Sequence, residues 1–222
     1  MKSWDKYGIM VNDWDSLLQI KFRENCLQDK VFCDVGACNG VFTSLFKELA
    51  GKNGKVIAFE MNPFNYSAIK YLESENCKLE NLAVTNKIGT VNFYADNLGS
   101  GNHTSNIVGH DSSGRMMDFI KEVKSTSLDE YFNGQKIDYI KIDVEGAEIG
   151  VISGAINTIK NCNYIIIECH FDEDWVELFN LLKSTGLDFR NIVDDEPIKL
   201  EETKQEPGIS SNGKPYQIYA KN

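Results

Sequence analysis

The sequence contains no long hydrophobic run. No segment approaches the roughly 18 apolar residues that a membrane-spanning helix needs. Residues 1–5, Met-Lys-Ser-Trp-Asp, carry no apolar core of the kind found in secretory signals. Internal repeats, coiled-coil heptads and low-complexity tracts are also missing. These absences argue against membrane-spanning and fibrous proteins, and we expect a soluble protein in the reducing environment of the cytoplasm.

Basic residues are scarce as well. Lys and Arg number 23 against 33 Asp and Glu, which leaves a formal net charge of −10. Binding to nucleic acid or to an anionic membrane surface needs an excess of positive charge, so the composition argues against both partners. No two of the six cysteines have Cys-x-x-Cys spacing. This spacing pattern argues against a zinc knuckle or a thioredoxin-like site.

After residue 30 the sequence alternates short apolar runs with amphipathic segments. A length of 222 residues suits one domain with a full core. We expect residues 1–30 to form a helical lead-in, with a helix over 14–26, and residues 31–222 to form the main domain. Alternating strands and helices predict an α/β protein with a mostly parallel sheet and helices on both faces. An antiparallel pair at the C-terminal end, 188–193 with 216–220, is expected to complete the sheet.

The individual elements can be placed approximately. The expected strands cover residues 31–35, 55–60, 78–84, 90–94, 137–143 and 164–170, and the expected helices 40–50, 63–75, 147–160 and 174–184. The segment 97–114 is rich in Gly, Ser, Asn and His and is expected to be a loop. A loop of that length inside a domain is typical of a lid or a binding segment, with plain surface disorder as the alternative.

The turn after the first strand has the pattern Asp34-x-Gly36-x-x-x-Gly40. The dinucleotide fingerprint has three glycines. Asp34 stands where the first of these glycines would be, and a carboxylate at that position would repel a pyrophosphate. The same carboxylate suits a cofactor that carries positive charge, such as the sulfonium and ammonium of S-adenosylmethionine. Gly36 and Gly40 would supply the tight turn and the close approach of the helix.

Two later strand ends complete the expected cofactor site. Glu60 ends the second strand, where an acidic side chain can accept hydrogen bonds from a ribose diol. Asn81-Leu82-Ala83 ends the third strand, where an adenine edge is expected. The alternatives are that Asp34 caps the first helix and that Glu60 is a solvated strand end. Because Asp34 and Glu60 stand at the ends of successive strands, an adenosyl site is favoured over these two alternatives.

The most concentrated charge lies in the run 141–148, Lys-Ile-Asp-Val-Glu-Gly-Ala-Glu. Ionisable groups at the carboxyl end of a buried strand are costly unless they are paired, bind a metal or take part in chemistry. Asp143 ends the fourth strand, and Glu168 and His170 share one face of the fifth. If those strands are neighbours, the three side chains converge at the edge of the sheet where ligands bind.

Taken together, the Asp34–Gly40 turn, Glu60 and the run 141–148 resemble the FkbM family of S-adenosylmethionine-dependent methyltransferases, over about residues 31–170. Ser127-Leu128-Asp129 and Ile167-Glu168 add to the resemblance. It implies a Rossmann-like, seven-stranded methyltransferase sheet and O-methylation of a small-molecule or glycan acceptor, commonly a sugar hydroxyl. One departure is that Cys38 stands where the family more often has Asn, so the cofactor contact expected of Asn39 is displaced by one residue.

Two roles stay open for the converging residues. In the first, Asp143, Glu168 and His170 bind a divalent metal such as Mg²⁺, which orients and acidifies the acceptor hydroxyl. In the second, His170 is the general base and an acidic residue orients it. Glu145 is expected to hydrogen-bond the acceptor. His103, in the long loop, is expected to reach it, with a solvent-exposed loop histidine as the alternative.

Lys141 and Glu148 have simpler explanations. Lys141 is expected to form a structural ion pair, and Glu148 to complement the dipole at the start of the next helix. Two other functions compete with methyl transfer. One is a nicotinamide-dependent oxidoreductase, and the other is a non-catalytic adenosyl-binding module. The sequence specifies neither the acceptor nor the oligomeric state.

Overall fold

A computed structural model of the chain describes residues 3–4, 10–11, 22–23, 28–95, 106–109, 115–170, 175–192, 195–198 and 216–222. Within these ranges two strands, β1 (Ser3–Trp4) and β2 (Met10–Val11), pair near the N-terminus. Of the helix expected over 14–26, residues 22 and 23 are described, and both are helical. His103 lies outside the described residues, and so does most of the expected loop 97–114.

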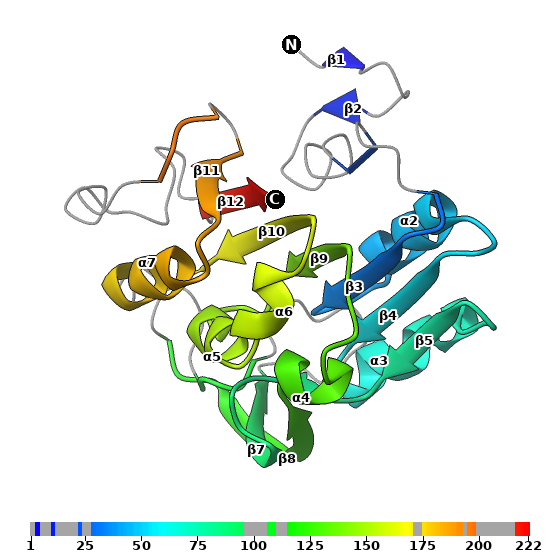
Figure 1. Ribbon diagram of the computed structural model, residues 1–222. Helices are drawn as coiled ribbons and strands as arrows, with labels where there is room; N and C mark the ends of the chain where they lie inside the picture. The colour runs from blue at the N-terminus through cyan, green and yellow to red at the C-terminus, as the bar shows by residue number, and fades with distance from the viewer. Residues whose placement is uncertain are drawn as a thin grey trace.

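The main body is a seven-stranded sheet flanked by helices (Figure 1). Its strand order is β11-β12-β10-β9-β3-β4-β5. The strands are β3 (Val31–Val35), β4 (Lys55–Phe59), β5 (Cys77–Glu80), β9 (Tyr139–Ile142), β10 (Tyr164–Cys169), β11 (Asp188–Asn191) and β12 (Tyr216–Lys221). The pairs from β10 through β9, β3 and β4 to β5 are parallel, whereas β12 runs antiparallel to both of its neighbours. The predicted α/β architecture with an antiparallel C-terminal strand is therefore confirmed.

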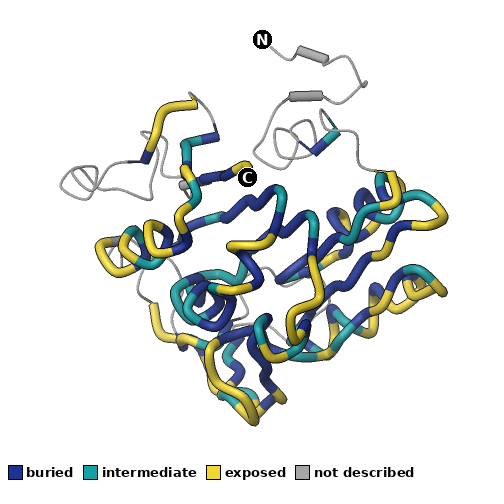
Figure 2. The backbone as a smooth tube through the Cα atoms, in the orientation of Figure 1, coloured by how far each residue is buried: buried dark blue, intermediate teal, exposed yellow. Residues whose placement is uncertain are grey.

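Helices cover both faces of this sheet because alternate residues of each strand are apolar on opposite sides. Along β3, Phe32 belongs to the core under α2 (Val41–Ala50) and α3 (Pro63–Ile69). Cys33 and Val35 belong to the other core, under α4 (Leu128–Phe132), α5 (Glu148–Ser153), α6 (Ile156–Lys160) and α7 (Trp175–Ser184). Figure 2 shows the result, with buried strands in the centre and exposed residues on the outer helices.

A second, three-stranded sheet lies at the bottom of Figure 1 and differs from the prediction. It consists of β6 (Ala83–Val84), β7 (Gly89–Ala95) and β8 (Asp118–Thr126). The strand expected over 78–84 is thus divided between two sheets. The sequence reading missed β8 because most of its side chains are exposed and its first half has no buried alternation.

Two predicted helices are shorter than expected. The helix expected over 63–75 ends as α3 followed by a single 3₁₀ turn, η1 (Lys70–Leu72). The helix expected over 147–160 breaks into α5 and α6 at Gly154. A β-carbon at Gly154 would lie 2.7 Å from the carbonyl oxygen of Thr85, so this close packing requires a glycine. None of the described helices is long and apolar enough to cross a membrane.

The strand ends matter most for the site. Glu60, Asp143 and His170 were predicted as the last residues of their strands, and each is instead the first residue beyond the strand. The carboxyl ends of parallel strands meet at one edge of a sheet, which brings these three residues to the same edge.

Candidate active site

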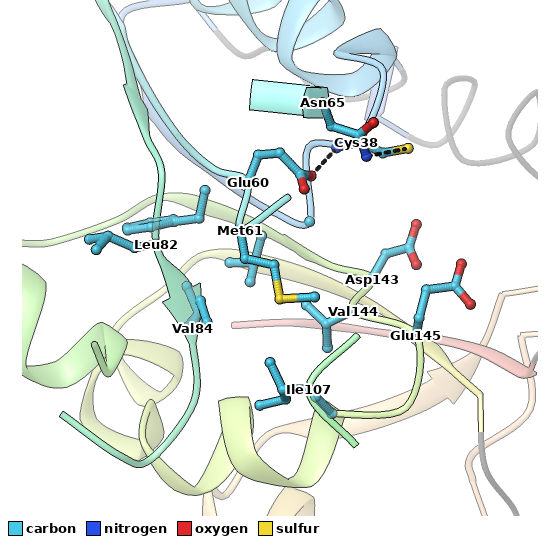
Figure 3. Close-up of a pocket in the computed structure, with 15 residues that line it drawn as sticks. Cys38, Glu60, Met61, Asn65, Leu82, Val84, Ile107, Asp143, Val144 and Glu145 are labelled. Atoms are coloured by element: carbon cyan, nitrogen blue, oxygen red, sulfur yellow. Dashed lines mark hydrogen bonds between the residues drawn. The ribbon is translucent and has the colours of Figure 1, made fainter. Parts of the chain in front are cut away.

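A cavity lies at this edge of the sheet, with a volume of about 580 Å³ that includes space open to solvent (Figure 3). Its walls come from the segments that follow β3, β4 and β9, and from β6. The lining residues are Val35, Gly36, Cys38, Phe59, Glu60, Met61, Asn65, Leu82, Ala83, Val84, Ile107, Asp143, Val144, Glu145 and Ala147. Sequence motifs from three separate parts of the chain therefore share one cavity.

The two glycines of the first turn have different neighbours. Both have left-handed backbone, with φ of +84° at Gly36 and +79° at Gly40. A β-carbon on Gly36 would lie 1.8 Å from the carbonyl oxygen of Asp143, and one on Gly40 would lie 2.6 Å from Leu72 Cδ1. Gly36 lines the cavity, whereas Gly40 packs against the end of η1. The predicted tight turn and close helix approach are both present.

Asp34 lies beneath the turn and is fully buried. Its Oδ2 accepts a hydrogen bond from Thr43 Oγ1 at 2.6 Å, and its Oδ1 lies 3.7 Å from Lys141 Nζ. Burial raises the pKa of Asp34, while Lys141 and Thr43 lower it. Asp34 bonds a side chain within α2 and does not cap the start of that helix. It is not among the residues that line the cavity, because the strand turns its side chain toward Thr43 of α2.

Glu60 does line the cavity, and it is held in place by backbone amides. Its Oε2 accepts from Cys38 N–H at 2.6 Å and its Oε1 from Asn62 N–H at 2.8 Å. The residue is 6% exposed, and burial raises the pKa of its carboxyl to about 7. Glu60 is therefore not a solvated strand end. Figure 3 shows the bond to Cys38 that ties it to the first turn.

The remaining predicted cofactor residues separate into two groups. Ala83 lines the cavity together with Leu82, as the position of the third strand end predicted. Asn39 is exposed, lies outside the cavity wall and accepts a hydrogen bond from Val41 N–H at 3.2 Å. Cys38, with a φ of +46°, lines the cavity in its place. The sequence reading also missed other lining residues. Val144 and Ala147 lie within the run 141–148 but were given no role, and no motif marked Met61, Asn65, Val84 or Ile107.

His170 lies among four carboxylates, three near its Nε2 and one at its Nδ1, and we call these five residues the acid–histidine cluster. Its Nε2 lies 3.6 Å from Glu145 Oε2, 3.7 Å from Asp143 Oδ1 and 3.8 Å from Glu168 Oε1. Asp143 and Glu145 also line the cavity, so the cluster and the cavity are continuous. The predicted convergence of Asp143, Glu168 and His170 is thus present in the structure.

Glu148 binds the other ring nitrogen of His170. Its Oε1 lies 2.8 Å from Nδ1 and also accepts a hydrogen bond from Gly146 N–H at 3.1 Å. A carboxylate can only accept, so Nδ1 carries the proton. Burial alone would lower the pKa of His170, but Glu148, Asp143 and Glu145 raise it to about 10. Glu148 begins α5 as predicted, but its side chain is buried against His170, a role that its position at a helix start did not indicate.

The possible metal ligands differ in one residue from the expected set. Among the described residues, Asp143, Glu145 and His170 offer ligand atoms that all lie within 4.8 Å of one another. Glu168 stands at the edge of this group, and its Oε2 accepts a hydrogen bond from Gln217 Nε2 on β12 at 3.2 Å. Burial raises the pKa of both Glu145 and Glu168 to about 7. Glu145 takes the place expected for Glu168 because the chain turns sharply after β9, with φ of +55° at Glu145.

Lys141 joins the two motifs. Its buried Nζ lies 3.1 Å from Asp143 Oδ2 and donates a hydrogen bond to the carbonyl of Gly36 at 3.1 Å. Burial opposes the charge, but Asp143 and Asp34 raise the pKa of Lys141 overall. The expected structural ion pair is confirmed, and it spans Asp34 on β3 and Asp143 after β9.

Comparison with known proteins gives one family and several relatives. The family model of the methyltransferase FkbM domain matches residues 34–190, well over half of the chain. A hexuronic acid methyltransferase, AglP, of Haloferax volcanii is 26% identical over 171 residues, which cover 74% of this chain and 66% of that protein. The chain thus spans slightly less than two thirds of this relative's length.

Solved structures show the same fold at low sequence identity. A methyltransferase FkbM from Methylobacillus flagellatus KT superimposes with a TM-score of 0.55 at 13% identity, over 87% of this chain and 44% of that one. A SAM-dependent O-methyltransferase from Thermotoga maritima gives a TM-score of 0.52 at 12% identity, over 96% of this chain and 66% of that one. At these identities the structures support the fold and carry no argument about the substrate.

Proposed function

This chain belongs to the family of methyltransferase FkbM domains, and we propose that it transfers a methyl group from S-adenosylmethionine to a hydroxyl of a sugar. The observation that carries the proposal is one continuous cavity, with Gly36 and Glu60 in one part of its wall and Asp143 and Glu145 in another. The first part has the features of a cofactor site and the second those of an acceptor site.

The residues of the first part fit the cofactor. Ionised Glu60 would accept hydrogen bonds from ribose hydroxyls, and Met61, Leu82 and Val84 would form an apolar wall for the adenine. When bound, S-adenosylmethionine supplies an activated methyl group on a positively charged sulfur. The surrounding carboxylates complement that charge.

The second part of the cavity would hold the acceptor. Methyl transfer is an in-line displacement, so the protein must orient the acceptor oxygen and accept its proton. Asp143 and Glu145 reach the cavity and can accept hydrogen bonds from sugar hydroxyls. His170 Nε2 faces these two carboxylates, so a proton leaving the acceptor has acceptors within the cluster.

A divalent cation remains a proposal for the same cluster. Asp143, Glu145 and His170 would hold it, because two carboxylates and an imidazole suit Mg²⁺ or Mn²⁺. Such an ion would lower the pKa of the acceptor hydroxyl. The alternative without a cation was His170 as the base, but its pKa of about 10 keeps the ring protonated near pH 7. Without a cation, the carboxylates of the cluster would therefore accept the proton.

A sugar as the acceptor is supported by the hexuronic acid methyltransferase activity named for the Haloferax relative and by the carboxylates of Asp143 and Glu145, which could accept hydrogen bonds from hydroxyls. The acidic cluster bears on which sugar is bound. A uronic acid would bring a further carboxylate toward Asp143 and Glu145, and like charges repel in a half-buried site. We therefore expect neutral sugars to be accepted without added cation, and acidic sugars to depend on one.

The test combines binding and transfer. Calorimetric titration should show micromolar binding of S-adenosylmethionine and none of NAD, and methyl-labelled cofactor should transfer its label to a panel of neutral and acidic sugars. Asp143→Asn is the control, which should keep cofactor binding and lose transfer. Binding of NAD alone would restore the oxidoreductase alternative, and cofactor binding without any transfer would favour the non-catalytic module. Labelling of RNA in place of sugars would contradict the acceptor class.

A further inference from the structure

The segment 106–109 reaches the active site from the three-stranded sheet. Asn106 pairs with Tyr94 of β7 through both backbone groups, at 2.9 and 3.1 Å. Ile107 packs against the core of that sheet and also lines the cavity. In the view of Figure 3, Ile107 lies on the far side of the cavity from Glu60. The small sheet is therefore part of the active-site wall.

Asn106 connects this segment to the acceptor side of the site. The residue is 1% exposed, and its Nδ2 donates a hydrogen bond to the carbonyl of Glu145 at 3.2 Å. Its Oδ1 accepts from the N–H groups of Val108 and Gly109, at 3.1 and 3.0 Å. The amide oxygen of Asn106 thus stabilises the turn 106–109, and the amide nitrogen binds Glu145, which is 39 positions away in the sequence.

Glu145 needs such support because its backbone is left-handed, with φ of +55°. Residues other than glycine rarely adopt this conformation. The direction of the Glu145 carboxylate, which lies 3.6 Å from His170 Nε2, depends on this turn. Because the side chain is fixed to this backbone, a displacement of the Glu145 carbonyl would change the direction of the carboxylate.

We propose that Asn106 is a positioning residue, which holds Glu145 in its left-handed conformation so that the carboxylate faces the sugar acceptor. The inference rests on the proposed function for the identity of the acceptor, and on the described contacts for the positioning. The small sheet would then contribute to acceptor recognition through Asn106.

Asn106→Asp is the sharpest test. It keeps the oxygen that accepts from Val108 and Gly109 and removes the donor to Glu145. We expect the KM for the acceptor to rise about tenfold, the Kd for S-adenosylmethionine to stay within about twofold, and the amide of Gly146 to exchange its hydrogen about five- to tenfold faster. Asn92→Asp on β7 is the matched control, because Asn92 is exposed and its side chain donates to the hydroxyl of Tyr94, away from Glu145.

A second comparison separates positioning from general destabilisation. In a Glu145→Gln background, Asn106→Asp should change the acceptor KM no further, because residues that act through one another are not additive. Unchanged Gly146 exchange, or equal losses of cofactor and acceptor affinity, would overturn the proposal. If the wild type methylates no sugar, the proposed function is wrong. In that case, hydrogen exchange at the Gly146 amide in the wild type and in Asn106→Asp still decides whether Asn106 positions Glu145.

Discussion

The backbone at Gly36 lies so close to that of Asp143 that a β-carbon on Gly36 would stand 1.8 Å from the Asp143 carbonyl oxygen. This contact joins the turn after β3 to the acidic run after β9. Lys141 reinforces it, since its Nζ bonds both the Gly36 carbonyl and the Asp143 carboxylate. The cofactor turn and the acceptor carboxylate are therefore held as one unit.

The first prediction follows from this contact. Gly36→Ala should lower the free energy of unfolding by about 4 kcal/mol or more, because it adds a backbone clash to an unfavourable φ. Gly134→Ala is the matched control, since Gly134 also has a positive φ but has no atom within 4 Å of an added β-carbon. It should cost about 1 kcal/mol. Chemical denaturation measures both, and similar losses would contradict the prediction.

Glu148 should affect catalysis through His170. Glu148→Ala removes the acceptor for His170 Nδ1 and should lower kcat about 10- to 100-fold, as loss of a carboxylate that orients a histidine does at metal sites. Glu148→Gln keeps an oxygen acceptor and should recover part of the loss. Glu122→Gln on exposed β8 is the control. Equal kcat in both Glu148 variants and in the wild type would refute the role.

Cofactor binding should depend on pH through Glu60. Burial holds the pKa of Glu60 near 7 in the free protein, while Asp34 raises it and Lys141 lowers it. Ribose hydroxyls donate to the ionised form, so binding should lower this pKa, release a proton near pH 7 and weaken as the pH falls below 7. Calorimetry in two buffers with different ionisation enthalpies measures the proton. Its absence, or tighter binding at low pH, would contradict this assignment.

The same shift has a consequence for stability. The folded pKa of Glu60 exceeds its unfolded value, so the ionised form is disfavoured in the fold. The contribution of Glu60 to stability is therefore most favourable at low pH and declines as the pH rises toward 7. Saturating S-adenosylmethionine should reduce this decline. Thermal unfolding with and without cofactor, between pH 5 and 8, provides the check.

A cation requirement would distinguish the two possible ligand sets. If the cluster binds a divalent ion, chelation should lower the rate of methyl transfer and Mg²⁺ should restore it. Glu145→Gln should then raise the Mg²⁺ concentration needed for half-maximal rate about 10- to 100-fold. Glu168→Gln should raise it less, because Glu145 and not Glu168 completes the compact set. Full activity of the chelated protein would rule out the cation and leave the carboxylates of the cluster to accept the proton.

Much of the fold was accessible from the sequence because strand and helix signals are local. The strand β3 was predicted with its observed bounds, and β10 ended one residue earlier than expected. Glu60 and Ala83 were recognised as cavity residues from their places at strand ends. By contrast, β8 has no strong apolar alternation, and its pairing with β7 depends on a partner more than 20 residues away.

The site was predicted less completely, for reasons of distance and direction. Spacing put Asp34 near a cofactor, but the pleat of β3 points its side chain under α2. A strand pattern placed Glu168 and His170 on one face, yet could not show that the turn at Glu145 brings a different carboxylate into the compact group. The sequence showed that Glu148 is a charged residue at a helix start, but it did not indicate that Glu148 binds His170.

The sequence by itself therefore determined the family and the α/β architecture, since both depend on short motifs and on alternation along the chain. Only the tertiary structure decided which carboxylates surround His170, which glycine packs against the backbone of Asp143, and that Asn106 donates a hydrogen bond to Glu145. Those relationships join segments that are distant in sequence, and their geometry is set by packing and by left-handed turns. Local propensity contains no information about either.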